Sequence, residues 1–216
     1  MSSRTRPKRG YSVGVERRNQ ILDAAMAEFA ASGYRGASLA QVAERVGLTQ
    51  PGLLHHFRSK EELLVGVLER RDELDAIALG LETDMVSMGR GFSGLRALVQ
   101  LVERNASRRG IVQLFTVLIG ESVTDGHPAQ EWAHKRYAWI RGLIVNSVRE
   151  GMDDGEIRED ADPVAVATGL VAMMDGLQLQ WLHDPESVDM AGLFRRYVDE
   201  LTADLRTKVA GRRSGR

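Results

Sequence analysis

The sequence predicts an all-α protein. Apolar residues recur at positions i, i+3, i+4 and i+7 along most of the 216-residue chain, and this spacing places them on one face of a helix. No segment of four or more residues shows the strict alternation and β-branched enrichment of a half-buried strand. Signals that start and stop helices separate the periodic segments. These three observations favour helices joined by turns.

Five segments show the apolar spacing most clearly. In chain order, their apolar positions are Leu22, Ala25, Met26 and Phe29; Leu39, Val42, Ala43 and Val46; Leu95, Leu98, Val99 and Val102; Ile111, Leu114, Phe115 and Leu118; and Phe194, Tyr197, Val198 and Leu201. Each set forms an apolar stripe, so each helix needs another element to bury it.

Capping residues indicate where helices begin. Ser38 and Ser59 are each followed three residues later by Gln or Glu, which is the spacing of a capping box. Asp162 followed by Pro163 is an N-cap with proline at the first helical position. Glycines interrupt the periodic segments. The expected helices span 16–32, 38–45, 49–56, 59–80, 93–108, 111–124, 128–150, 162–183 and 189–206.

Composition excludes several classes of protein. An apolar fraction of 43% is sufficient for a sizeable core. No apolar run approaches the 18 residues of a membrane-spanning helix, and the N-terminus lacks the apolar stretch of a signal peptide. The absence of cysteine excludes disulfides, thiolate catalysis and cysteine-bound zinc. We therefore expect a cytoplasmic protein with no membrane partner.

Charge is distributed unevenly along the chain. Residues 1–71 contain 12 Lys/Arg and 7 Asp/Glu, a net charge of +5, whereas residues 72–205 contain 12 and 23, a net charge of −11. Residues 206–216 add five basic residues and no acidic one. A basic N-terminal part before an acidic body is typical of a nucleic-acid-binding domain joined to another module. Solvated basic termini would give the same pattern.

The segment 48–64, "LTQPGLLHHFRSKEELL", follows a short helix and a turn. Gly47 can adopt the left-handed backbone of a tight turn, Thr49 can cap the next helix, and Pro51 falls in its first turn. Two short helices joined by such a turn, both packed on the helix containing Phe29, predict a helix-turn-helix.

This geometry explains the two adjacent histidines. Leu53 and Phe57 would face the bundle. The residues left on the other side are Thr49, Gln50, Gly52, His55 and His56. A recognition helix places its N-terminal residues in the major groove, and the Gln50 amide can pair with adenine. His56 and Lys60 are better placed for phosphate contacts.

Residues 17–64 resemble the DNA-binding domain of the tetracycline-repressor (TetR) family of transcriptional regulators. The matching motifs are "ILDAA", "F…GY", "S…VA…G", the recognition helix "L-x-x-F" and "SKEELL". The resemblance implies that Ser38 caps the second helix and touches phosphate, and that His56 and Lys60 contact the DNA backbone. Pro51 stands where the family often has glycine, and Leu54 where it often has tyrosine.

The resemblance continues less closely through residues 127–182. It implies an all-helical C-terminal domain that binds small molecules and dimerises through its last two long helices. We therefore expect a DNA-binding domain at 15–74 and a ligand-binding and dimerisation domain at 75–206, flanked by disordered basic segments at 1–14 and 207–216. The N-terminal arm could reach a minor groove.

Mid-helix positions in the C-terminal part suggest a ligand pocket, because cavities in bundles form between helices near their centres. The candidate lining residues are Phe115, Leu118, Trp139, Met174, Gln178 and Trp181. None is basic, which favours a neutral or weakly polar ligand. The candidate residues of a dimer interface are Leu170, Leu177, Phe194, Val198 and Leu201. Core packing is the alternative for both sets.

Three functions remain to be compared. The first is a dimeric repressor that binds an inverted-repeat DNA operator and is released by a small apolar or aromatic molecule. The second is a DNA-binding regulator without a ligand, whose C-terminal half only dimerises or binds a protein. The third, an enzyme or metalloprotein, is disfavoured: His55 and His56 point about 100° apart, and the Glu131–His134 pair occurs once. We expect no cofactor and no metal.

Overall fold

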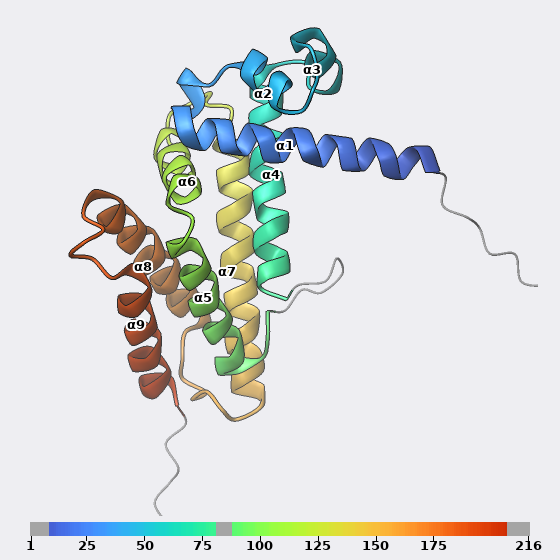
Figure 1. The fold of residues 1–216 in the computed structure, drawn as a ribbon. Coiled ribbons are helices and arrows are strands. Elements are labelled where there is room, and N and C mark those ends of the chain that lie inside the picture. The colour runs from blue at the N-terminus through green and yellow to red at the C-terminus, as the bar shows by residue number, and fades with distance from the viewer. Residues whose placement is uncertain (1–8, 81–87, 207–216) are drawn as a thin grey trace, which may run out of the picture. The chain divides into compact units, whose positions relative to one another are not determined.

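The computed structural model describes residues 9–80 and 88–206, with side chains from residue 14 on. These residues form nine helices and no strand (Figure 1), apart from one isolated antiparallel bridge between Ile157 and Arg206. The helices are α1 (Arg9–Gly36), α2 (Leu39–Arg45), α3 (Gln50–His56), α4 (Lys60–Ala78), α5 (Gly91–Ala106), α6 (Arg109–Glu121), α7 (Gln130–Asp153), α8 (Pro163–His183) and α9 (Met190–Leu205). The predicted all-α class is confirmed.

The first helix is longer than predicted. Because α1 begins at Arg9, the expectation of a disordered arm is wrong for residues 9–14. No proline follows Pro7 in this segment, so every residue from 9 to 14 has the backbone N–H group that a helix uses. The remainder of the arm, 1–8, and the tail, 207–216, lie outside the described residues.

The chain divides into two compact units. The first comprises residues up to 73 together with 113–133, and the second comprises 74–112 and residues from 134 on. This differs from the predicted division at residue 74, because the C-terminal part of α6 and the start of α7 group with the first unit.

In the first unit, α2 packs against both α1 and α3, and buried side chains of α1 to α4 form the core (Figure 1). Phe29 of α1, Leu53 of α3 and Leu64 of α4 are fully buried. A Cβ on Gly66 would lie 2.9 Å from the Leu22 side chain and 3.1 Å from the Phe57 ring. Glycine at this position therefore permits the close approach of α4 to the helix-turn-helix.

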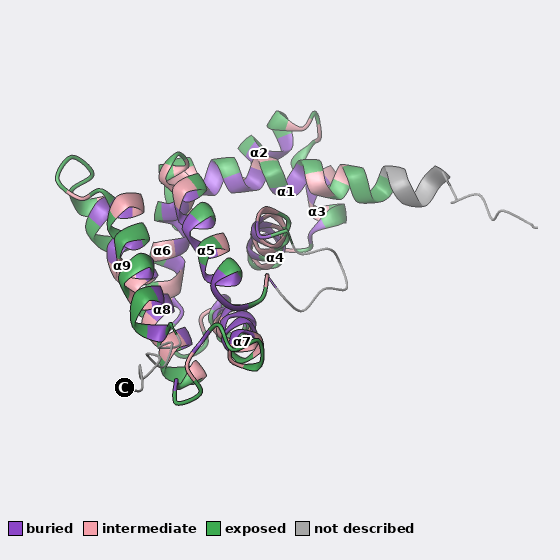
Figure 2. Ribbon diagram, turned by 90° about the horizontal axis from the view of Figure 1, so that it is seen from below, coloured by how far each residue is buried: buried purple, intermediate pink, exposed green. Residues whose placement is uncertain are grey.

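The second unit is built around α9, which packs against both α5 and α8. Each of these helices has a buried face and an exposed face (Figure 2). Phe92 and Leu95 of α5 are fully buried in the same core as Ile144 of α7. A Cβ on Gly151 would lie 2.6 Å from the Gly91 backbone, so only a residue without a side chain fits where α7 meets the start of α5.

Most of the residues predicted to form a dimer interface belong to this core. Leu170, Leu177, Phe194 and Val198 are at most 7% exposed within a single chain. Such side chains have almost no surface left for a second subunit to cover. Leu201 is partly buried against the same core. Within one chain, α5 and α8 already bury the stripe on α9, which makes it a poor candidate for the contact between subunits.

Three of the four predicted helix caps are present. Thr49 Oγ1 accepts a hydrogen bond from the Gly52 amide, and the Asp162 carboxylate accepts from the amides of Val164 and Ala165. Ser59 Oγ accepts from the Glu62 amide at 3.1 Å. Glu62, however, accepts a hydrogen bond from the Arg58 amide, so the box is shifted by one residue.

Ser38 differs from the other predicted caps. It occupies the N-cap position of α2 with an extended backbone, but its hydroxyl makes no cap hydrogen bond. The predicted capping box with Gln41 is therefore wrong. Only the Ser38 carbonyl takes part in α2, accepting from the Val42 amide at 3.1 Å.

Candidate DNA-binding and ligand-binding sites

The turn between α2 and α3 has the geometry of a helix-turn-helix. Gly47 has a φ of 65°, a conformation that glycine adopts readily. Thr49 then caps α3, and Pro51 lies in the first helical turn, where no backbone hydrogen bond is lost. The predicted turn residue, cap and proline position are confirmed. Together they give the amino end of α3 a defined direction.

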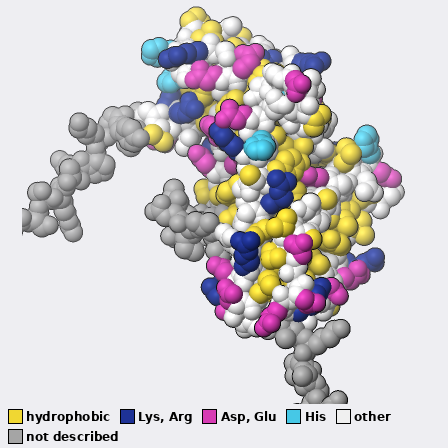
Figure 3. Space-filling view, turned by 180° about the vertical axis from the view of Figure 1, so that it is seen from behind, with side chains coloured by type: hydrophobic (Ala, Val, Ile, Leu, Met, Phe, Trp, Pro, Cys, Tyr) yellow, Lys and Arg dark blue, Asp and Glu magenta, His cyan; other side chains and the backbone are white. Residues whose placement is uncertain are grey.

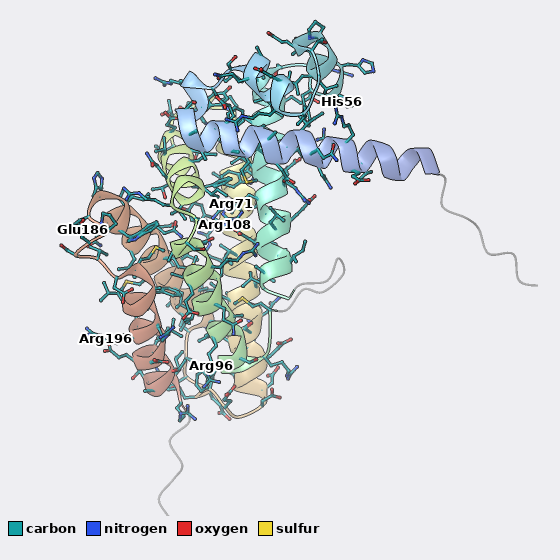
Figure 4. All side chains as sticks on the ribbon, viewed as in Figure 1. His56, Arg71, Arg96, Arg108, Glu186 and Arg196 are labelled. Atoms are coloured by element: carbon teal, nitrogen blue, oxygen red, sulfur yellow. The ribbon has the colours of Figure 1, made fainter. Side chains whose placement is uncertain are left out.

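The two sides of α3 have different environments. Leu53 and Phe57 are fully buried, as predicted, and anchor the helix to the rest of the unit. The exposed residues of this segment are Thr49, Gln50, Pro51, His55 and His56, with Gly52 partly exposed. Figure 4 shows His56 on the outer side of α3. The side chains predicted to meet DNA are thus accessible from solvent.

Two arginines of α1 contact the helix-turn-helix, and neither was predicted as a functional residue. Arg17 donates a hydrogen bond from Nη2 to the Val46 carbonyl in the α2–α3 turn at 2.6 Å. The Arg18 guanidinium lies 4.4 Å from the centre of the Phe57 ring, at the end of α3. These contacts connect α1 to both ends of the recognition segment. The Arg-Arg pair early in α1 is the only sequence signal for them.

A buried carboxylate joins α1 to α2. Glu28 is 3% exposed, and its carboxylate accepts hydrogen bonds from Arg45 at 3.0 Å and from the Ser32 hydroxyl at 3.1 Å. A buried carboxylate requires such partners, because desolvation would otherwise disfavour its charged form. Arg45 is thereby used for structure, although it lies in the basic N-terminal region.

Lys60, predicted as a phosphate contact, binds the end of α1. Its ammonium group donates to the Ala37 carbonyl at 2.7 Å and to the Arg35 carbonyl at 3.1 Å, and lies 5.1 Å from the centre of the Tyr34 ring. A cation is favourable at this position because the last carbonyl groups of a helix lack partners. Two of the three N–H donors of Lys60 are used in this way, and one remains.

Tyr34 provides a second connection between α1 and α4. Its hydroxyl donates a hydrogen bond to the Glu61 carboxylate at 3.3 Å. Burial and the adjacent Glu61 carboxylate raise the pKa of Tyr34 to about 12, so the phenol remains a neutral donor. The start of α4 is therefore attached to the end of α1 through two consecutive residues, Lys60 and Glu61.

Two of the six predicted ligand-binding residues lie in the first unit. Phe115 and Leu118 of α6 are at most 3% exposed. The Arg71 guanidinium, which extends from α4 toward α6 in Figure 4, lies 4.1 Å from the centre of the Phe115 ring. The centres of the Trp132 and Phe115 rings are 6.0 Å apart. Phe115 is thus in contact with both a cation and an aromatic ring.

The other four predicted residues lie in the second unit. Met174 and Trp181 belong to its buried core, whereas Trp139 and Gln178 are only partly buried. Arg109, at the start of α6, donates a hydrogen bond to the Leu182 carbonyl at 2.7 Å, and its guanidinium lies 5.9 Å from the Trp181 ring centre. Arg109 was not identified from the sequence.

No group of three or more His, Asp or Glu side chains among the described residues is arranged to hold a metal ion. The rings of His55 and His56 are 6.1 Å apart and nearly perpendicular. In the described part of the chain, no helix has the length and apolar character required to cross a membrane.

Family models match both parts of the chain. Residues 21–67 match the model described as bacterial regulatory proteins of the tetR family. Residues 94–203 match the model described as the C-terminal part of BetI-type transcriptional repressors. The chain belongs to the TetR family of bacterial transcriptional regulators. Members of this family bind DNA and small-molecule effectors and are typically dimers, and they are not enzymes.

Relatives of known sequence or structure agree with this assignment. The TetR-family chain is 32% identical over 194 residues to the transcriptional regulator TtgR of Pseudomonas putida, covering 85% of this chain and 89% of TtgR. A TetR regulator from Chloroflexus aurantiacus has the same fold, with a TM-score of 0.75 at 22% identity over 91% of this chain and 100% of that one. SmeT, the repressor of a multidrug efflux pump of Stenotrophomonas maltophilia, has a TM-score of 0.68 in its complex with triclosan, at 20% identity over 90% of this chain and 93% of SmeT.

Proposed function

We propose that this TetR-family protein is a homodimeric repressor that binds an inverted-repeat operator and leaves it when a small apolar or aromatic molecule binds. It would act in the cytoplasm on chromosomal DNA. The observation that carries the DNA-binding part is the exposed amino end of α3, with Gln50 next to the Thr49 cap and Leu53 buried behind it. A recognition helix needs this combination of an accessible end and an anchored face.

The exposed residues divide into two roles. Gln50, flanked by Thr49, Pro51 and Gly52, would meet base edges, where its amide can form two hydrogen bonds to adenine. Ser38, whose hydroxyl is not used as a helix cap, would contact phosphate. The other proposed backbone contacts are His55, His56 and Lys60.

Lys60→Ala should test both the structural and the DNA-binding role of this lysine. Removing the ammonium group leaves the carbonyls of Arg35 and Ala37 without their donor, so we expect the free energy of unfolding to fall by about 1–3 kcal/mol. If its remaining N–H group contacts phosphate, the dependence of DNA affinity on salt should also fall by about one unit. Urea titration and DNA titrations at several salt concentrations measure the two effects.

Arg58→Ala is a suitable control, because this neighbouring basic side chain is exposed and only its backbone amide makes a hydrogen bond in the described structure. We expect its unfolding free energy to stay near the wild-type value. Unchanged unfolding of Lys60→Ala would show that its contacts with α1 do not contribute to stability. An unchanged salt dependence would remove Lys60 from the proposed phosphate contacts.

Dimerisation requires a surface that one subunit leaves exposed. Leu179 on α8 and Leu193 on α9 are 50% and 40% exposed, and both lie near the turn that joins these helices. Val164, at the other end of α8, is 56% exposed. The view from the side opposite to Figure 1 shows apolar surface between scattered charged groups (Figure 3). We propose the exposed face of α8 and α9 that carries Leu179 and Leu193, in place of the buried stripe, as the contact between two subunits.

A two-fold dimer explains why the operator would be an inverted repeat. It places two copies of α3 roughly 34–36 Å apart, or a multiple of that distance, on one side of the duplex. An effector can favour a dimer in which the two copies of α3 have a different spacing that does not fit the operator. The resulting change in DNA affinity is limited to the difference between the effector's affinities for the two dimer conformations, typically ~1–3 kcal/mol. Selecting DNA fragments with the purified protein, then screening compounds for release, tests the proposal.

We propose Trp139, Met174, Gln178 and Trp181 of the second unit as effector-binding residues, and Phe115 and Leu118 of the first unit as separate candidates. An aromatic effector is supported by SmeT, a protein of the same fold that was solved with triclosan. Trp139 and Gln178 are the best positions for a test, because they are only partly buried and their replacement should leave the fold intact. Trp139→Ala should keep DNA binding and weaken compound-induced release.

The alternative, a regulator without a small-molecule ligand, is favoured by one observation. Phe115, Leu118, Met174 and Trp181 are each at most 9% exposed, as expected of packed core. The compound screen distinguishes the alternatives. Release of operator by a compound, lost in Trp139→Ala, supports the effector site; release retained in that variant would place the effector elsewhere.

A further inference from the structure

We infer that a groove between α7 and α8 binds a small organic carboxylate. The groove has a volume of about 210 Å³ and lies wholly within the second unit, between two helices that are labelled in Figure 1. Its lining residues are Tyr137, Arg141, Thr168, Val171, Ala172 and Asp175. None of the six proposed effector residues lines it. The inference therefore adds a second site and an anionic class of ligand to the proposed function.

Arg141 is the residue of the groove that would bind an anion. Its side chain is partly buried, yet among the described residues it makes no hydrogen bond and no ion pair. Among the described residues, its guanidinium makes a cation–π contact with the Tyr137 ring, whose centre lies 5.9 Å from the guanidinium carbon. A guanidinium carries five N–H donors in a planar fork that matches a carboxylate. Arg141 lines the groove, and no acceptor among the described residues pairs with its guanidinium.

The carboxylate in the same groove already has other partners. Asp175 accepts a hydrogen bond from the Tyr137 hydroxyl at 2.7 Å and has further interactions of its own. Burial, followed by the hydrogen bond to Asp175 and its negative charge, raises the pKa of Tyr137 well above its ordinary value. The phenol stays neutral and donates to Asp175. Its ring is thereby held in place under Arg141.

The lining limits the ligand further. Val171 and Ala172 offer a short apolar wall, which suits a hydrocarbon body. One guanidinium matches one negative charge, and Asp175 would repel a second, so a monocarboxylate fits better than a phosphate ester. The volume is below the ~300–1,000 Å³ of drug-sized sites, which favours a small molecule. Benzoate has these properties and is a suitable probe.

Calorimetric titration of the full-length protein with benzoate and with benzamide tests the site without DNA or any effector assay. Benzamide has the same shape without the charge, so we expect it to bind at least about tenfold more weakly than benzoate. Arg141→Gln should weaken benzoate binding about 10- to 100-fold and leave benzamide unchanged. Arg149→Gln, at an exposed arginine about two turns further along α7, removes the same charge outside the groove and should have no such effect.

Ala172→Leu provides a second variant that does not alter charge. Ala172 is exposed, so a larger residue should be tolerated by the fold, but it would fill the groove and abolish benzoate binding. Three results would overturn the inference. They are failure of the folded wild-type protein to bind benzoate, equal weakening by Arg141→Gln and Arg149→Gln, and dissociation of the dimer by Arg141→Gln with no binding of acid. The last would assign the guanidinium to the contact between subunits.

Discussion

Phe194→Glu and Val198→Glu should each prevent the second unit from folding, and not merely separate two subunits. Both side chains are at most 1% exposed in the single chain. Loss of a buried phenylalanine costs about 3–5 kcal/mol, and a buried unpaired carboxylate costs several kcal/mol more. Together these approach the whole stability of a typical domain, about 5–15 kcal/mol. Circular dichroism during urea titration should show a large loss of helix.

Leu179→Glu combined with Leu193→Glu is the matched comparison. These leucines lie on the same two helices, α8 and α9, but on their exposed side. Charges there should change the stability of a subunit by no more than about 0.5 kcal/mol while they disfavour an apolar contact between subunits. Sedimentation should therefore detect folded monomers that bind operator weakly.

The two sets of variants separate core from interface. A folded, monomeric Phe194→Glu protein would contradict the placement of that residue in the core of one subunit. A Leu179→Glu, Leu193→Glu protein that remained dimeric would show that the proposed α8–α9 face is not the contact. A wild-type monomer would remove the two-fold mechanism altogether.

Gln50→Ala should reduce operator affinity by about 1–3 kcal/mol and leave affinity for random DNA nearly unchanged. The reason is positional, because Gln50 is exposed directly after the Thr49 cap, at the end of α3 that would enter the groove. Gln41→Ala, at an exposed glutamine of α2, is the control for loss of an amide elsewhere in the same unit. Fluorescence anisotropy with both duplexes measures the difference.

A result in which Gln50→Ala weakens operator and random DNA equally would show that its amide does not read bases. Phosphate contact would then be the better description of its role, since such contacts are independent of sequence. Equal effects of Gln50→Ala and Gln41→Ala on the operator would exclude a special role for the start of α3.

The recognition segment could be predicted from the sequence because its signals are local. The turn depends on Gly47, the start of the helix on Thr49 and Pro51, and the buried face on Leu53 and Phe57. All of these residues lie within eleven positions, 47–57, so that spacing alone determines which side chains share a face. A fixed combination of such signals also carried the resemblance to the TetR family.

The dimer interface could not be predicted in the same way. Periodicity shows that Phe194 and Val198 form a stripe that has to be buried, but it does not show what buries it. The packing partners of α9 are α5 and α8, and α5 lies about a hundred residues earlier in the chain. Leu179 is exposed, but the apolar periodicity of the sequence does not set it apart from buried leucines. The folded structure is needed to tell them apart.

Contacts made by long side chains between distant parts of the chain could not be predicted from the sequence either. Lys60 reaches the carbonyls of Arg35 and Ala37, which lie 25 and 23 residues earlier, and no local motif encodes that contact. Tyr137 and Arg141 are four residues apart on one helix face, a spacing that does suggest contact. Their relation to Asp175, 38 residues further on, required the structure.

In the proposed complex, two copies of α3 read the two halves of one operator. The most direct test compares two duplexes: a selected operator, and the same operator with one half-site scrambled. The affinity of the protein and the number of bound subunits are measured for each. Since each mismatched base pair costs about 1–3 kcal/mol, we expect two subunits on the intact duplex and at least about 100-fold weaker binding to the scrambled one. Equal affinity for the two duplexes, or one subunit on the intact operator, would contradict the claim.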